Sequence, residues 1–173
     1  MKSIWLAFLL FGCTTTTVAP FTDLPTVTPS TAPSSSLSPS SNVQCLPTDQ
    51  DQYVYHPYRL VVLSPCATAS GTIYSIKAEA DGDLHIRLTL DPEYQGLINS
   101  VNVSGQLGKL VIEPVCVKGV TQADAIDICS KDTDPIDISN LAVGQHVTIT
   151  GRYVTDTQHG GWAEFHPLYS LTP

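Results

Sequence analysis

Residues that could hold a metal ion lie in two parts of the sequence. Near the end of the chain, Glu164 and His166 are two residues apart and follow His159. On a β-strand such a spacing puts Glu164 and His166 on the same face. With His85 they supply imidazole and carboxylate groups, which are ligands of Zn²⁺. Because a metal-bound water can hydrolyse an ester, these residues suggest a divalent metal site and a metal-dependent hydrolase.

A structural role for the same histidines is the competing interpretation. In the fold argued below, His85 and His166 lie on strands separated by a third strand, so their backbones are about 9.6 Å apart. Zinc requires both nitrogens at about 2.0–2.1 Å. The sequence contains no G-x-S-x-G, Walker, C-x-x-C or H-E-x-x-H motif. We therefore favour a non-catalytic binding or accessory module, with a hydrolase centred on His159, Glu164 and His166 as the alternative.

The predicted ligand-binding face belongs to the segment 83–91, in which apolar and polar residues alternate. Such alternation is typical of a strand with one dry and one wet face. The apolar positions are Leu84, Ile86, Leu88 and Leu90. The polar positions include Asp83, His85 and Arg87, which together with Lys109 form the predicted ligand site, beside Glu113. The chemistry of the ligand does not follow from these residues.

Five segments have the composition or alternation of strands and position these side chains. The first comprises residues 59–63 and 71–79, a long strand that Gly71 would allow to bend, and the others are 83–91, 109–116, 146–154 and 162–171. Asp81-Gly82 predicts a hairpin between the first two strands. Residues 92–108 are expected to form a loop, and Thr121 is expected to cap a short helix over 122–130. This order predicts an all-β fold, a five-stranded OB-fold-like Greek-key barrel with a short helical insertion between the third and fourth strands.

Four cysteines lie in the predicted domain, at positions 45, 66, 116 and 129. In an exported chain an even number favours disulfides, for which three connectivities are open. Proximity in sequence suggests that Cys45 pairs with Cys66 and Cys116 with Cys129. A zinc site formed by the cysteines is the alternative, but it lacks the C-x-x-C spacing.

Composition divides the chain and limits its partners. Residues 13–42 begin with Cys13 and are otherwise rich in Ser, Thr and Pro, which predicts a disordered tether before a domain over 43–173. The net charge of the whole chain is −8. Nucleic acid is therefore not the expected partner, since its binding depends on Lys and Arg. The composition does not decide between a protein and a small molecule as the ligand.

The N-terminus carries a lysine, a short apolar run and then Leu10-Phe11-Gly12-Cys13. The run is too short to span a bilayer and is typical of a signal peptide. The end of the run resembles the lipobox of bacterial lipoproteins, although Phe11 departs from its usual small residue. The resemblance implies that residues 1–12 are removed and that Cys13 carries a diacylglycerol. It further implies a protein anchored by lipid to the extracytoplasmic face of the cell membrane, without a transmembrane helix. An ordinary signal peptide that happens to contain a cysteine is the alternative.

A second resemblance covers residues 70–172. Residues 80–86 carry a D-G-D-x-H motif, and residues 159–167 carry an H-G and an E-x-H-P motif. In this combination they resemble an uncharacterised family of small bacterial OB-like domains. The resemblance implies the barrel but no activity.

Overall fold

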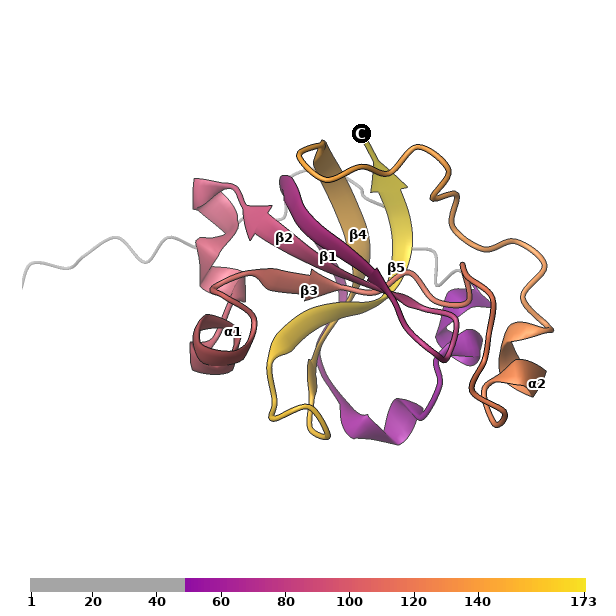
Figure 1. Cartoon of the computed structure of the whole chain (residues 1–173). Helices are drawn as coiled ribbons and strands as arrows, with labels where there is room; N and C mark the ends of the chain where they lie inside the picture. Colours follow the sequence, from indigo (N-terminus) through magenta and orange to yellow (C-terminus); the bar gives the residue numbers. More distant parts are fainter. Residues whose placement is uncertain (1–48) are drawn as a thin grey trace, which may run out of the picture. The chain divides into compact units, whose positions relative to one another are not determined.

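The computed structural model describes residues 49–173, which form five strands and a few short helices (Figure 1). The strands are β1 (Leu60–Ala78), β2 (Leu84–Leu90), β3 (Leu110–Ile112), β4 (His146–Asp156) and β5 (Ala163–Thr172). They are hydrogen-bonded in the order β1-β2-β3-β5-β4, and β4 pairs with β1, so that the sheet closes into a barrel. The pair β3 and β5 is parallel, and the other pairs are antiparallel. The predicted all-β class is confirmed.

Alternation along the strands produces the core. The four leucine and isoleucine side chains predicted to face inward on β2 are all buried. They pack with Leu110 and Ile112 of β3 and with Phe165 of β5. Because side chains alternate between the two faces of a strand, the residues between these core positions point out of the barrel. On β2 and β5 those outward positions include His85 and His166, and Glu113 directly after β3 continues the same alternation.

The two apolar segments predicted for the first strand form one continuous strand, and Gly71 lies where its pairing changes. The strand pairs with β4 from Leu60 to Thr72 and with β2 from Gly71 onward, so Gly71 belongs to both ladders. An added β-carbon at position 71 would lie 3.0 Å from the Leu90 Cα and would overlap the Thr89 carbonyl oxygen. Only glycine allows the two backbones to approach this closely.

Gly71→Ala is therefore expected to lower the free energy of unfolding by about 1–3 kcal/mol, because the new methyl group must displace the β2 backbone. Urea denaturation followed by circular dichroism measures this change. Gly96→Ala is the matched control, since no atom lies within 4 Å of a β-carbon at position 96. An unchanged midpoint for Gly71→Ala would show that β2 can move without cost.

The helices differ from the prediction. The expected loop 92–108 contains a 3₁₀ helix, η3 (Pro92–Leu97), and the helix α1 (Ser100–Gly105). The prediction missed α1 because its signal is an Asn99 capping box, in which the Asn99 side chain accepts hydrogen bonds from two backbone N–H groups of the first turn. The expected helix 122–130 is shortened to α2 (Ile126–Cys129) and lacks a side-chain cap. Thr121 does not cap it, because the helix begins five residues later and the Thr121 hydroxyl donates to the Ala80 carbonyl in the β1–β2 turn. Two further 3₁₀ helices, η1 (Asp49–Tyr53) and η2 (Pro57–Arg59), precede β1.

The third strand is shorter than predicted. Its ladder ends at Ile112, and Pro114 soon afterwards has no N–H to donate. The chain then leaves the barrel, and Cys116 forms the predicted disulfide with Cys129. The bond joins two positions 13 residues apart and ties α2 to the end of β3.

Several predictions concern residues 1–48, which lie outside the described residues. They are the signal peptide, the lipidated Cys13, the tether and the Cys45 end of the predicted bond to Cys66. Within residues 49–173, no helix has both the length and the apolar character needed to cross a bilayer.

Candidate functional site

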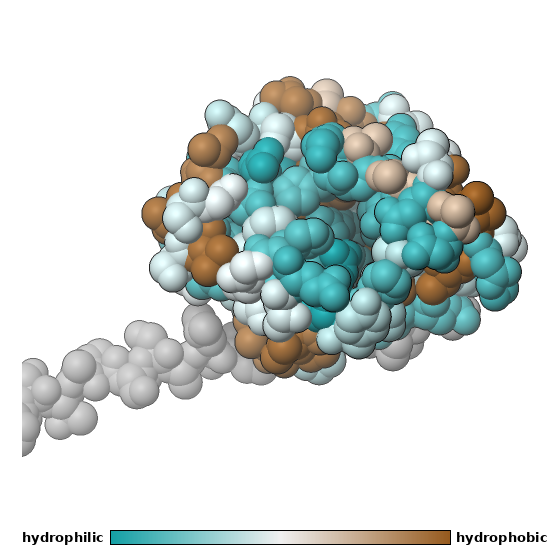
Figure 2. All heavy atoms as spheres, turned by 60° about the horizontal axis from the view of Figure 1, so that its bottom comes forward, coloured by the Kyte–Doolittle hydropathy of each residue, from teal (hydrophilic) through white to brown (hydrophobic). Residues whose placement is uncertain are grey.

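A polar cleft of ≈ 540 Å³ opens at one end of the barrel. It lies between the β1–β2 turn, the outward side chains of β2, Glu113 just after β3, and the β4–β5 loop. Figure 2 views the molecule from the side of the β4–β5 loop and shows hydrophilic side chains around a hollow. The residues lining the cleft include Tyr55, Arg59, Lys77, Glu79, Asp81, Asp83, His85, Arg87, Gln106, Glu113, His159 and Trp162.

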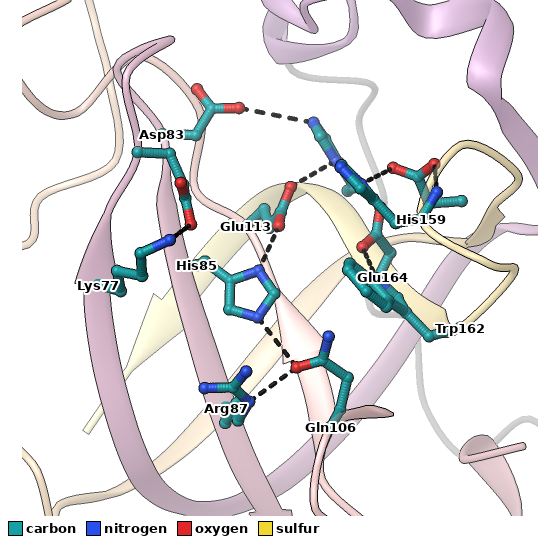
Figure 3. Close-up of polar contacts among 12 residues, drawn as sticks. Lys77, Asp83, His85, Arg87, Gln106, Glu113, His159, Trp162 and Glu164 are labelled. Atoms are coloured by element: carbon teal, nitrogen blue, oxygen red, sulfur yellow. Dashed lines mark hydrogen bonds and ion pairs between the residues drawn. The ribbon is translucent and has the colours of Figure 1, made fainter. Parts of the chain in front are cut away.

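Glu113 and His85 lie next to each other on the floor of this cleft (Figure 3), and Glu113 joins His85 to a second histidine, His166, buried beneath it. Its Oε1 lies 2.9 Å from His85 Nδ1, and its Oε2 lies 2.8 Å from His166 Nδ1. The register of the sheet explains this position. Ile86 pairs with Ile112, and Ile112 pairs with Phe165, so the next residue of the third strand, Glu113, lies between His85 and His166. The strand that separates the two histidines thus supplies the carboxylate that connects them.

Gln106 and Arg87 determine the protonation of His85. The Arg87 Nε donates to the Gln106 side-chain oxygen at 2.7 Å, which requires the amide to present its oxygen. The same oxygen lies 3.2 Å from His85 Nε2, so that nitrogen must carry a proton. The other ring nitrogen donates to the Glu113 carboxylate. His85 is therefore doubly protonated and positively charged in this arrangement.

His166 and Glu164 are both fully buried behind Glu113. The Glu164 Oε1 lies 3.2 Å from His166 Nδ1, and its Oε2 accepts a hydrogen bond from the Trp162 indole at 2.6 Å. The Trp162 ring also stacks on His159, with ring centres 5.0 Å apart. Glu164 thus connects the buried histidine to an aromatic wall of the cleft.

Asp83 faces His166 from the β1–β2 turn, and only one of its oxygens is hydrogen-bonded. Its Oδ1 accepts the backbone N–H of Cys116 at 2.8 Å, which the disulfide holds in place. Its Oδ2 lies 3.7 Å from His166 Nε2, too far for a hydrogen bond. Both of these atoms are buried without a hydrogen-bond partner.

Burial and mutual charge shift the ionisation of the cluster. Burial raises the pKa of Asp83 to about 7, although His166 opposes this shift. Burial and the charge of Glu113 raise the pKa of Glu164. Burial disfavours the ionised form of Glu113, yet the two histidines, above all His166, hold its pKa well below the usual range.

The pKa values of His166 and His85 are raised, although burial alone would lower them. Burial lowers the pKa of His166, but Glu113 and Glu164 outweigh it and raise the value to about 10. Burial likewise lowers the pKa of His85, and the hydrogen bond and charge of Glu113 raise it above its ordinary value. Glu113 therefore favours the charged form of both rings.

A second polar cluster shapes the β4–β5 loop at the other side of the cleft. Asp156 is fully buried and forms an ion pair with Arg59 at 2.9 Å. Its Oδ1 accepts the backbone N–H groups of Gln158 and His159, and its Oδ2 contacts the His159 ring at 2.9 Å. The loop that presents His159 and Trp162 is thus organised around one carboxylate.

The structure gathers the predicted metal ligands only in part. Among the described residues, two sets of three potential ligands have atoms within 4.8 Å of one another, and neither set includes His85, His159 or Glu164. One set is Asp83, Glu113 and His166, and the other is Asp83 with the two disulfide cysteines. His159 differs from His166 because its ring bonds to Asp156 and its side chain is half exposed.

Of the four predicted ligand-binding residues, three line the cleft and one does not. Asp83, His85 and Arg87 line the cleft, whereas Lys109 does not and lies over the Tyr74 ring at 5.2 Å. His85, on the outward face of β2, was expected to be exposed to solvent, but this residue is only 8% exposed. The expectation was wrong because Glu113, Gln106 and Trp162 cover the ring.

Three residues of the site, Gln106, Arg59 and Asp156, were not predicted from the sequence, and neither was the bridging role of Glu113. The outward position of Glu113 could have been predicted from the sequence, since Leu110 and Ile112 face the core and alternation places residue 113 on the other face. No periodic pattern marks Arg59 or Asp156, which meet across nearly a hundred residues of chain.

Comparison with known proteins gives no further assignment. No family model, no curated protein and no solved structure matches the chain.

Proposed function

We propose that this protein is a lipid-anchored binding module whose polar cleft receives an oligosaccharide. The observation that carries the proposal is the position of the cleft: it lies on the outward side of β2 and of Glu113, the residue that follows β3, between the β1–β2 turn and the β4–β5 loop. OB-folds bind oligosaccharides and oligonucleotides with the corresponding strands and loops. The strand order, with a parallel β3 and β5 pair, supports an OB-like barrel.

The chemistry of the lining favours a neutral, polyhydroxylated ligand over a nucleic acid. Carboxylates of Glu79, Asp81, Asp83 and Glu113 line the cleft. The basic groups of Arg59, Lys77 and Arg87 are offset by these carboxylates, so the cleft has no excess of positive charge with which to bind phosphates, and the net charge of the chain is −8. The lining also offers hydrogen-bond donors and acceptors beside the Trp162 ring, whereas pockets for drug-like ligands are mostly apolar.

The membrane anchor is part of the same proposal. The apolar run and Cys13 support lipidation, and two or more acyl chains are needed for stable attachment. The Ser/Thr/Pro-rich residues 14–42 would then hold the barrel away from the lipid surface. Mass spectrometry of the membrane fraction should find Cys13 as the modified first residue, and an unmodified Cys13 would remove the anchor from the proposal.

Binding can be tested with the full-length protein in detergent and a panel of soluble probes. The panel contains neutral glucose oligomers, N-acetylglucosamine oligomers, uronic acid oligomers and a single-stranded DNA oligonucleotide. We expect at least one of the two neutral classes to bind, with NMR shift changes at Trp162 and Arg87, and no binding of DNA. Trp162→Ala should weaken the binding roughly tenfold or more, because a buried aromatic anchor contributes at least about 1.4 kcal/mol.

Tyr74→Ala is the matched control, since Tyr74 is a half-exposed aromatic residue that does not line the cleft. Its binding should equal that of the wild type. The proposal fails if neither neutral class binds, or if the shift changes in the wild type map away from the cleft.

A further inference from the structure

Two buried polar atoms face each other beneath the cleft. The Asp83 Oδ2 and the His166 Nε2 are 3.7 Å apart, and neither has a hydrogen-bond partner. Their residues are 2% and 0% exposed. Buried polar atoms are almost always hydrogen-bonded, so a facing pair of unpartnered atoms requires an explanation.

We infer that a divalent transition-metal ion of the zinc class binds between Asp83 Oδ2 and His166 Nε2. Bonds to zinc are about 2.0–2.2 Å from a carboxylate oxygen and about 2.0–2.1 Å from an imidazole nitrogen, so the two together can span up to about 4.3 Å. A separation of 3.7 Å therefore allows one ion to reach both atoms at an angle. The ion takes the place of a proton on His166 Nε2.

The rest of the cluster already holds both ligands in position. The Cys116 N–H binds the other oxygen of Asp83 at 2.8 Å and leaves Oδ2 directed at His166. Glu113 and Glu164 accept from the other nitrogen of His166, at 2.8 and 3.2 Å. A carboxylate on the far nitrogen of a metal-binding histidine is the usual arrangement around zinc, where it orients the ring.

The charges of the cluster also suit a divalent cation. Three buried carboxyl groups, those of Asp83, Glu113 and Glu164, surround His166. When all three are ionised, His85 supplies one positive charge and a divalent ion supplies two, with His166 neutral. The net charge of the cluster is then zero. With both histidines protonated and no metal ion, the net charge would be −1.

The ion would have open coordination positions toward the cleft, because Asp83 and Glu113 line it. Two protein ligands leave at least two positions of a tetrahedral ion for water or for a ligand oxygen. This inference goes beyond the proposed function, since it concerns a metal and not the oligosaccharide. Failure of zinc binding would leave the oligosaccharide experiment unaffected, and the reverse also holds.

The test uses the full-length protein, purified in detergent without a polyhistidine tag and treated with a chelator that is then removed. Titration with Zn²⁺ in a calorimeter should show one equivalent per chain. Asp83→Asn retains the shape of the side chain and the acceptor for the Cys116 N–H, and it should weaken zinc binding by at least tenfold. Glu113→Gln should weaken it by about 10–100-fold, as expected for a group that orients a ligand.

His146→Gln is the matched control, because His146 also contacts a carboxylate, that of Asp91 at 2.9 Å, but lies on the surface. It should bind zinc like the wild type, and so should His159→Gln. Co²⁺ added to the wild type should broaden the NMR signals of Cys116 and His166 first, which tests the site even if Asp83→Asn does not fold. The inference is overturned if the wild type binds no zinc, if Asp83→Asn binds as tightly as the wild type, if His159→Gln loses the ion, or if Co²⁺ broadens signals elsewhere in the barrel before those of Cys116 and His166.

Discussion

Replacing Glu113 with alanine should lower the free energy of unfolding by about 3–5 kcal/mol, the cost of removing one partner from a buried ion pair. Glu113 is 7% exposed and accepts from both His85 and His166. Without it, two buried imidazolium groups lose their shared counter-charge and must release protons or move apart. Chemical denaturation of the chelator-treated protein measures the loss.

Glu79→Gln is the control for this variant, because the pair of Lys77 and Glu79 is exposed and separated by 2.8 Å. An exposed pair contributes about 0–1 kcal/mol, so Glu79→Gln should change the stability little. A Glu113→Ala protein as stable as Glu79→Gln would mean that Glu113 is not a counter-charge to either ring.

The effect of Glu113→Ala should depend on pH in a defined direction. The folded-state pKa of His166 is raised to about 10 from the ordinary 6.5, so the stability that it contributes is fully present below pH 6.5 and is lost as the pH rises through about 10. Glu113 has a lowered pKa, so its contribution is present above its ordinary pKa and is lost as the pH falls through the lowered value. The difference between wild type and Glu113→Ala should therefore be largest between the ordinary pKa values of Glu113 and His166, 4.5 and 6.5, and should shrink as the pH rises from 6.5 toward about 10. A constant difference would indicate an effect of packing alone.

Asp156→Ala is the second substitution for which we expect a loss of about 3–5 kcal/mol. The Arg59 guanidinium would then be a buried charge without its carboxylate, since the Arg59 side chain is only 8% exposed. The backbone N–H groups of Gln158 and His159 would also lose their acceptor. The β4–β5 loop should loosen, which thermal unfolding and increased amide exchange of residues 157–162 would report.

Asp127→Ala is the matched control for Asp156→Ala. Asp127 pairs with Lys131 at 2.7 Å on an exposed helix surface, where such a pair contributes about 0.3–0.5 kcal/mol. If both aspartate variants unfold at the same denaturant concentration, the buried pair has no special role in holding the loop. Because Asp156 positions the loop of Trp162, its loss should also weaken the oligosaccharide binding proposed above.

The strands could be located from the sequence because alternation is a local property of the chain. The pattern of Leu84, Ile86 and Leu88 predicts which face of β2 is buried without knowledge of its neighbours. The long first strand, the turn at Asp81-Gly82 and the proximity of Cys116 to Cys129 are local in the same sense. Helix α1 was missed although its Asn99 cap is also local, because its capping box consists of two asparagines, Asn99 and Asn102, instead of the usual Ser or Thr followed by Glu or Gln.

The site depends on long-range register, which no local pattern contains. The spacing of Glu164 and His166 places them on one face, but only the pairing of β3 with both β2 and β5 puts Glu113 between His85 and His166. A shift of one residue in either ladder would turn Glu113 into the core. Likewise, Asp83 faces His166 because the disulfide loop returns the Cys116 N–H to it, and Arg59 meets Asp156 because the barrel closes between β1 and β4. The chain's composition therefore supplies the charged groups, and closure of the barrel decides which of them are buried together.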